Sequence, residues 1–359
     1  MNWYLVAKIV FWSAALVVVY TYVAYPLLIM ILAGWLPHRY QRKPITPTIS
    51  IVIAAYNAAN EITDKLASCF TLDYPASLIE VIVVSDGSTD ETETIVKRLL
   101  LHYPNLTLIC LRIHNGKATA LNVGIATAKG EIVIFTDARQ RLAVDAARNL
   151  VANFADPNVG AVSGELIFID ERQRPQMGGV DLYWRYERWL RQMEAQIHSS
   201  CGATGALYAV RRNLLAPIPD GLVLDDLLIP MRVVLAGYRI VFDTSAHAYD
   251  YLAANAEAEF VRKVRTLYGN YQLLVVEPRL WKPWTNPIFW QFFSHKICRL
   301  LVPFCLLLLF TTNLVLTSGV YLVLLVLQIG WYLLALIGHL LRKENNTNTR
   351  NYLNSVEKA

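Results

Sequence analysis

The chain has 359 residues, of which 55% are hydrophobic, and its formal net charge is +5. This composition is too apolar for an ordinary soluble domain and indicates a membrane protein. The positive charges cluster beside the apolar segments, so the net charge requires no nucleic-acid partner. The five cysteines have no CxxC pair and no metal-ligand spacing, and we expect buried thiols.

An uncharged apolar run over residues 11–36 predicts a membrane-spanning helix, which defines an N-terminal segment 1–37. The run exceeds the roughly 20 residues that cross a hydrocarbon core. A cleaved signal peptide is disfavoured, because its apolar core has only about 7–15 residues.

A second apolar block, residues 300–341, has about twice the length of one span and predicts a helical hairpin that turns near Thr317. The segment 281–299 before it is expected to be an interfacial helix. Basic residues flank every predicted span at 39–43, 296–299 and 342–343. The positive-inside rule then predicts a multi-pass protein of the bacterial inner (plasma) membrane, with residues 46–280 and a tail 342–359 in the cytosol.

The middle segment, 46–280, alternates short β-branched runs with helical-period stretches, which predicts an α/β domain with a parallel sheet. The predicted strands are Ile49 to Ala55, Ile79 to Ser85, Leu106 to Leu111 and Glu131 to Thr136. Open parallel sheets bind ligands beyond the carboxyl ends of their strands. Tyr56, Asn57, Asp86 and Asp137 follow three of these runs. Each alone is typical of a turn or cap, but together they predict a site.

Three later segments also have the composition of a binding site. Residues 202–212, GATGALYAVRR, combine small residues with a strand-like end, which is typical of a close backbone approach. Asp225 and Asp226 begin a helix that stops at Gly237, where acidic residues also complement the helix dipole. The basic amphipathic helix 259–272 suits either lipid headgroups or a phosphate clamp.

The ordered series AAYNAANE, VVSDGSTD, NGKATALN, FTDA, GATGALYAVRR and LDDLLIPMRVVLAGY resembles the membrane-bound family 2 glycosyltransferases. That family includes the cellulose, chitin and hyaluronan synthases and the bacterial poly-N-acetylglucosamine synthases. The resemblance covers roughly residues 46 to 280 and the layout of the spans. It implies a GT-A (Rossmann-like) fold and transfer with inversion at the anomeric carbon.

The resemblance also implies a role for each matching residue. The nucleotide of the donor would contact Ala55, Tyr56, Asn57, Glu61, Asp86, Lys117 and Asp137. The catalytic base would be Asp226, and the diphosphate would bind Arg262 and Arg265. The acceptor would lie against Gly202, Thr204, Gly205 and Asp225. Trp184, in an aromatic and basic stretch, suits either an interfacial anchor or stacking on the acceptor sugar.

Two motifs depart from the family pattern. The DxD motif is Asp137-Ala138-Arg139, so Mg²⁺ or Mn²⁺ would keep one carboxylate ligand, Asp137, beside phosphate oxygens and waters. The QxxRW motif ends in Thr266 where the polymerising synthases have tryptophan, which weakens the inference of a long-chain polymerase.

Three functions therefore stay open. The chain could make a β-linked exopolysaccharide or cell-envelope glycan from a UDP-sugar, or add one sugar to a lipid or lipid-linked acceptor. It could also be a non-catalytic nucleotide-sugar-binding subunit, which Arg139 suggests and the retained Asp226 and Arg265 oppose. Three spans are few for a polysaccharide channel, so secretion would need a homo-oligomer or an export partner.

Overall fold

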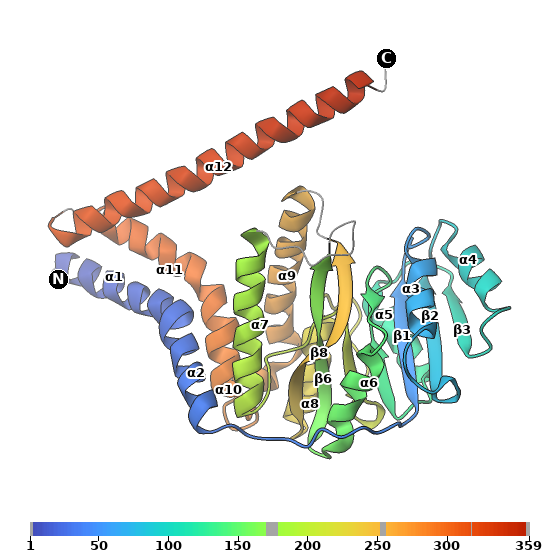
Figure 1. Cartoon of the computed structure of the whole chain (residues 1–359). Coiled ribbons are helices and arrows are strands. Elements are labelled where there is room, and N and C mark those ends of the chain that lie inside the picture. The colour runs from blue at the N-terminus through green and yellow to red at the C-terminus, as the bar shows by residue number, and fades with distance from the viewer. Residues whose placement is uncertain (1–2, 170–178, 252–255, 317, 357–359) are drawn as a thin grey trace. The chain divides into compact units, whose positions relative to one another are not determined.

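The computed structural model describes all residues except 1–2, 170–178, 252–255, 317 and 357–359. The chain divides into two compact units, Met1–Ala24 with Cys298–Ala359 and Tyr25–Ile297. The larger unit contains the whole sheet and every expected site residue (Figure 1).

The larger unit is built on a mixed sheet, which has eight strands in the described part of the chain, in the order β3-β2-β1-β4-β7-β6-β8-β5. The strands are β1 (Ile49–Ala55), β2 (Ile79–Asp86), β3 (Leu106–Leu111), β4 (Ile132–Phe135), β5 (Arg141–Leu142), β6 (Val159–Ile169), β7 (Tyr208–Arg211) and β8 (Arg239–Tyr251). The first four pair in parallel, as predicted. The expectation of an all-parallel sheet is wrong beyond β4, because β7 runs antiparallel between β4 and β6.

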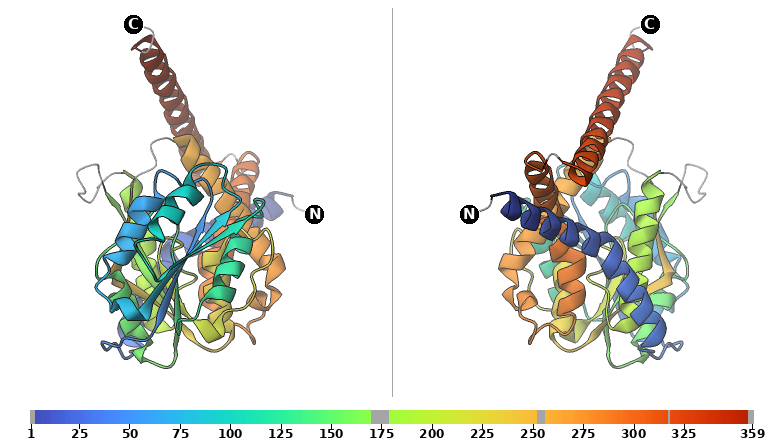
Figure 2. Two further views of the ribbon diagram at one scale, coloured as in Figure 1. Left: turned by 90° about the vertical axis from the view of Figure 1, so that its right-hand side faces the viewer. Right: turned by 90° about the vertical axis from the view of Figure 1, so that its left-hand side faces the viewer.

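Helices lie on both sides of this sheet (Figure 2). The helices of the larger unit are α2 (Tyr25–Trp35), α3 (Ile62–Phe70), α4 (Thr92–Leu99), α5 (Lys117–Thr127), α6 (Ala146–Ala152), α7 (Gly179–Ile197), α8 (Asp225–Leu235), α9 (Ala256–Val276) and α10 (Phe289–Phe292). In β1, Ile51 and Ile53 pack with α3, whereas Val52 packs with α5 and α8. This two-residue alternation explains why a strand buried on both faces is a continuous apolar run.

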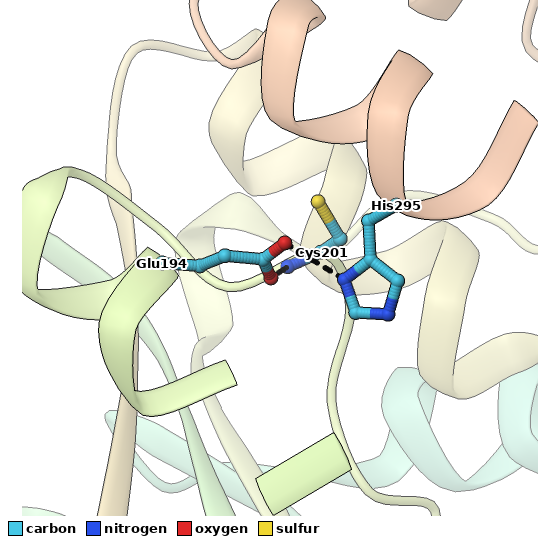
Figure 3. A group of neighbouring side chains, drawn as sticks. All are labelled: Glu194, Cys201 and His295. Carbon is cyan, nitrogen blue, oxygen red and sulfur yellow. Dashed lines mark hydrogen bonds and ion pairs between the residues drawn. The ribbon is translucent and has the colours of Figure 1, made fainter. Parts of the chain in front are cut away.

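A buried polar cluster attaches α7 to the rest of the larger unit (Figure 3). Nδ1 of His295 lies 2.7 Å from Oε1 of Glu194, and its Nε2 lies 3.2 Å from Oε2 of Glu187. The Tyr25 hydroxyl donates to the same Glu194 oxygen at 2.6 Å. The cluster therefore joins α2, α7 and the π-helical segment Phe293–Ile297 by hydrogen bonds within the protein interior.

Cys201 lies beside this cluster, and its ligand atom and those of Glu194 and His295 lie within 4.8 Å of one another. The carboxylate already binds the imidazole, the Tyr25 hydroxyl and the backbone N–H of Cys201. Burial raises the pKa of Glu194, but His295 and these hydrogen bonds lower it by a larger amount, so the pKa lies below its ordinary value. We interpret the cluster as a buried hydrogen-bonded group that positions α7.

The smaller unit contains α1 (Trp3–Val19), the π-helix Tyr20–Ala24, α11 (Cys298–Asn313) and α12 (Val320–Val356). Three helical runs of the described residues are long and apolar enough to cross a membrane: Trp3–Trp35, Phe289–Asn313 and Val320–Gly338. The expected number and order of apolar helices, one N-terminal and two C-terminal, is confirmed. The second run begins at Phe289, within the segment expected to be interfacial, and α12 extends into the expected tail as far as Val356.

The cluster around Glu194 predicts an unequal effect of two substitutions. Glu194→Ala removes the shared partner of the Tyr25 hydroxyl, the Cys201 N–H and Nδ1 of His295, and should cost about 3–5 kcal/mol of unfolding free energy. Arg148→Ala removes an exposed ion pair with Asp73 (2.7 Å) and should cost about 0–1 kcal/mol. Thermal unfolding of the purified full chain in detergent measures both, and equal melting temperatures would contradict the interpretation.

Candidate active site

A cleft of ≈ 490 Å³ lies at the carboxyl ends of β1 and β2, where an open parallel sheet is expected to bind its ligand. It is lined by strand ends, the segment that leads into α5, the loop before α8 and one side chain of α9. Five residues expected at the donor line it together: Ala55, Tyr56, Asp86, Lys117 and Arg265.

One wall of the cleft is aromatic. The rings of Tyr56 and His114 have centroids 4.0 Å apart and an interplanar angle of 30°. Nδ1 of His114 lies 2.8 Å from Oδ2 of Asp86, which holds the imidazole against the tyrosine. Stacked π faces of this kind accept a nucleobase of any identity.

Asp86 fixes the backbone that follows His114 in this wall. Its buried carboxylate accepts backbone N–H bonds from Asn115 (2.9 Å) and Gly116 (2.8 Å). Gly87 follows at φ +67°, and a Cβ there would lie 2.5 Å from the backbone nitrogen of His114. The turn after β2 therefore requires glycine, and it brings the loop before α5 against the strand end.

Asn57 and Glu61, both expected at the nucleotide, lie outside the residues that line the cleft. Asn57 has φ 48°, and its Oδ1 accepts the backbone N–H of Thr89 at 2.8 Å. Its own N–H donates to Ser88 at 3.2 Å. Asn57 thus ties the loop after β1 to the loop after β2, and Glu61 is the residue that precedes α3.

Lys117 lies between two carboxylates at the inner end of the cleft. Its Nζ is 2.7 Å from Oδ1 of Asp137 and 3.0 Å from Oδ1 of Asp225. Burial lowers the pKa of Lys117, but the nearby carboxylates raise it by more, so the ammonium stays charged. The Tyr208 hydroxyl donates to the other oxygen of Asp225 at 3.1 Å. Asp225 is thus a buried partner of Lys117, in addition to being the first residue of α8.

Asp226 is next to this group and is less shielded. Its Oδ2 accepts the backbone N–H of Gly205 at 3.1 Å. A Cβ at Gly205 would lie 3.0 Å from the same oxygen, which explains the small residue. Burial and the charge of Asp225 raise the pKa of Asp226 to about 6, although Lys117 and Arg191 act in the opposite direction. A carboxylate with this pKa is suited to accept a proton near neutral pH.

Of the other expected acceptor residues, Gly202 and Thr204 lie beside Asp226 and Gly205, whereas no contact between described residues brings Trp184 to them. Gly202 has φ +95° and a Cβ there would lie 2.7 Å from a methyl group of Leu227, so glycine is required. Thr204 accepts a hydrogen bond from Nη1 of Arg191 at 3.0 Å. The partly exposed Trp184 packs edge-on against Phe168, with ring centroids 5.5 Å apart.

Arg139, in the place of the second DxD carboxylate, turns away from Asp137. Its Nη2 lies 2.6 Å from Oδ2 of the buried Asp250 at the end of β8. Gln140 donates to the same oxygen at 3.0 Å. Asp137 keeps an exposed side chain with one oxygen bound to Lys117. The described residues thus fit a Mg²⁺ or Mn²⁺ ion through a single carboxylate, with phosphate oxygens and water as the other ligands.

A fully buried lysine supports the segment that carries Asp137. Nζ of Lys65 in α3 donates to Oγ1 of Thr136 at 2.5 Å and to the carbonyl of Gln140 at 2.8 Å. Burial lowers its pKa to about 8. Lys65 thereby attaches both ends of the segment 136–140, which contains Asp137, to α3.

The two expected diphosphate residues lie one turn apart on α9. Arg265 is exposed and lines the cleft with Tyr56 and Lys117. Arg262 precedes it by three residues and is partly exposed. The sequence interpretation missed His114, Tyr208 and Arg191, and only His114 had a signal, because it directly precedes the NGK motif.

The family model described as Glycosyl transferase family 2 matches residues 50–216. Poly-beta-1,6-N-acetyl-D-glucosamine synthase from Staphylococcus epidermidis is 35% identical over 117 residues, which make up 32% of this chain and 28% of that protein. Probable glycosyltransferase YdaM from Bacillus subtilis is 25% identical over 237 residues, 64% of this chain and 56% of that protein. The chain thus spans between about a quarter and just over half of these curated relatives.

Among solved structures, the mannosyltransferase PcManGT from Pyrobaculum calidifontis, in complex with GDP-Man and Mn²⁺, aligns with a TM-score of 0.70. It is 26% identical, and the alignment covers 89% of this chain and 92% of that chain. The expected GT-A architecture is thereby confirmed. Asp226 and Arg265 lie beyond the residues that the family model matches.

The geometry at Asp226 predicts a large rate effect and a pH dependence. Asp226→Asn should lower transfer by about 10²–10⁴-fold with donor affinity unchanged, because an amide cannot accept the proton. In the parent protein, kcat/KM should fall as the pH drops through about 6, since the base must be ionised.

Asp225→Asn is the matched neighbour. It removes a carboxylate that raises the pKa of Asp226, so the acidic limb of the profile should move to lower pH. Initial transfer rates across pH and nucleotide titrations measure both variants. An Asp226→Asn variant that keeps more than about a tenth of the parent rate would contradict the assignment.

Proposed function

Because residues 50–216 form a domain of glycosyl transferase family 2, we propose that this chain is an inverting, membrane-bound glycosyltransferase. It would transfer a hexosyl or N-acetylhexosaminyl group from a UDP-sugar to an acceptor hydroxyl. The observation that carries this proposal is the position of Asp226, a carboxylate with a pKa of about 6 beside the Lys117 ion pairs and the donor cleft.

The proposed reaction is a direct displacement. Asp226 removes the proton of the acceptor hydroxyl, whose oxygen attacks the anomeric carbon of the donor. The bond between this carbon and the diphosphate oxygen breaks, and UDP leaves from the opposite face. The proton stays on Asp226 until water takes it.

The leaving diphosphate carries the charge that develops during this step. Lys117 and Arg265 line the same cleft and supply two fixed cations, and Arg262 is one turn from Arg265. Preorganised charges of this kind stabilise a transition state more than they stabilise the substrate. A divalent ion held by Asp137 and the phosphate oxygens would neutralise further charge when bound.

We propose that Tyr56 and Asp86 both serve the nucleotide, Tyr56 by direct contact and Asp86 through its neighbours. Tyr56 offers its face to the base, and Asp86 acts chiefly through His114 and the backbone of residues 115–116. Asn57 ties the loops after β1 and β2 together, and the expected contacts of Asn57 and Glu61 with the nucleotide stay a prediction. The resemblance to poly-N-acetylglucosamine synthases supports a uridine nucleotide.

A product of one or a few sugars on a lipid-linked acceptor is the second candidate. It is favoured by Thr266, whose hydroxyl donates to the backbone carbonyl of Arg262 at 2.9 Å within its own helix. This position therefore presents no aromatic face to a growing chain. Membrane insertion through the three apolar helices, with the larger unit in the cytosol, suits either product.

The activity is tested on the purified full chain in detergent with UDP-N-acetylglucosamine, UDP-glucose, UDP-galactose and GDP-mannose. We expect release of UDP from at least one UDP-sugar and a labelled product whose length separates the two candidates. Asp226→Asn is the negative control for transfer. Binding of nucleotide sugar without release of any nucleoside diphosphate would favour the non-catalytic subunit instead.

The metal site predicts a weak but real dependence on a divalent ion. Excess chelator should lower the rate without abolishing it, because Asp137 is the single carboxylate ligand of the described segment. Arg139→Asp combined with Asp250→Asn should lower the Mn²⁺ concentration for half-maximal rate, since it adds a ligand without leaving Asp250 opposite a like charge. Asp250→Asn alone is the control, and full activity in chelator would contradict the site.

A further inference from the structure

Among the described residues, two buried polar atoms of β6 and α7 have no hydrogen-bond partner. They are Oε2 of Glu165 in β6 and Nε of Arg191 in α7. The Glu165 residue is only 7% exposed. Most buried polar groups in folded proteins are paired, and an unpaired one requires an explanation.

These atoms belong to one polar surface between α7 and β6, which we call the acceptor strip: Ser163, Glu165, Arg188, Arg191 and Thr204. Arg188 binds Oε1 of Glu165 at 3.0 Å and is three residues before Arg191, on the same side of the helix. Arg191 binds Oγ1 of Thr204 at 3.0 Å, and the backbone N–H of Thr204 donates to Ser163 at 3.0 Å.

The acceptor strip leads directly to the proposed base. Gly205, which follows Thr204, donates its N–H to Asp226 at 3.1 Å. The charge of Arg191 also acts on Asp226. Arg191, Thr204 and Asp226 are all partly exposed, so a ligand can reach this end of the strip.

The two unpaired atoms are a hydrogen-bond acceptor and a hydrogen-bond donor. A hydroxyl group can satisfy either, because it both donates and accepts. An ionised phosphate could accept from Arg191 but would meet the Glu165 carboxylate with a like charge. A hydrocarbon chain could satisfy neither atom.

We propose that Glu165 and Arg191 bind hydroxyl groups of the acceptor substrate, which is a carbohydrate with further hydroxyls beside the one that Asp226 deprotonates. This inference rests on the proposed transferase function and narrows its acceptor. The carboxylate of Glu165 disfavours a bare lipid phosphate as the acceptor. A free glycan and a lipid-linked sugar share the recognised chemistry, and the experiment distinguishes them.

The test uses Glu165→Gln and Arg191→Lys in the purified full chain. The glutamine keeps size but replaces the orphaned carboxylate, and the lysine keeps charge but loses the Nε–H donor. Arg185→Gln is the control, because Arg185 is an exposed arginine of the same helix outside the acceptor strip. Probes are β-linked glucose and N-acetylglucosamine tetrasaccharides, short-chain alkyl glycosides of both sugars, their monodeoxy analogues, and a polyprenyl phosphate.

Both variants should raise KM for the saccharide acceptor by about tenfold or more, the effect of one hydrogen bond to a charged group. Arg185→Gln should leave KM unchanged. UDP affinity should stay at the parent level in all three proteins, because the donor cleft contains none of the three residues. A lower KM for the tetrasaccharide than for the alkyl glycoside would indicate a free glycan as the acceptor. The reverse order would indicate a lipid-linked sugar.

A monodeoxy acceptor that lacks the recognised hydroxyl should lose affinity for the parent but not for the variant that lacks its partner. Equal losses for parent and both variants would overturn the inference, as would transfer to polyprenyl phosphate in preference to every saccharide. Absence of UDP-sugar hydrolysis in the parent would instead refute the transferase proposal. Loss of UDP binding in the variants alone would assign Glu165 and Arg191 to the fold and also overturn the inference.

Discussion

The ammonium of Lys117 is the interaction on which the site depends. It lies within 3.0 Å of carboxylates from two segments that are far apart in the chain, Asp137 and Asp225. Without it, these two groups and Asp226 would repel one another in a partly buried space. Lys117 is also the first residue of α5, where a cation opposes the helix dipole. The attraction of Lys117 to Asp137, Asp225 and Asp226 outweighs this unfavourable interaction with the helix dipole.

Much of the site could be predicted because its residues follow strands with a clear apolar pattern. Tyr56, Asp86 and Asp137 end β1, β2 and β4, and parallel pairing brings such ends to one edge. The role of Asn57 could not be predicted in this way. Its partner Thr89 is 32 residues away, and the positive φ that directs its side chain is a property of the folded loop.

The half of the sheet beyond β4 was predicted less well, for a related reason. Pairing of β7 with both β4 and β6 is antiparallel, and no local period in the sequence encodes the direction of a neighbouring strand. The Arg139 pair with Asp250 spans 111 residues and depends on this register. From the sequence, Arg139 could only be described as the loss of a metal ligand from the DxD motif. The structure shows that it forms an ion pair with Asp250.

The buried cluster of Tyr25, Glu194 and His295 has a mechanical consequence. α7 cannot tilt without breaking the buried hydrogen bonds that join Glu194 to Tyr25 and His295, because water does not reach these groups to replace the lost bonds. α7 should therefore keep its position during turnover, so that the acceptor binds and leaves along a fixed surface.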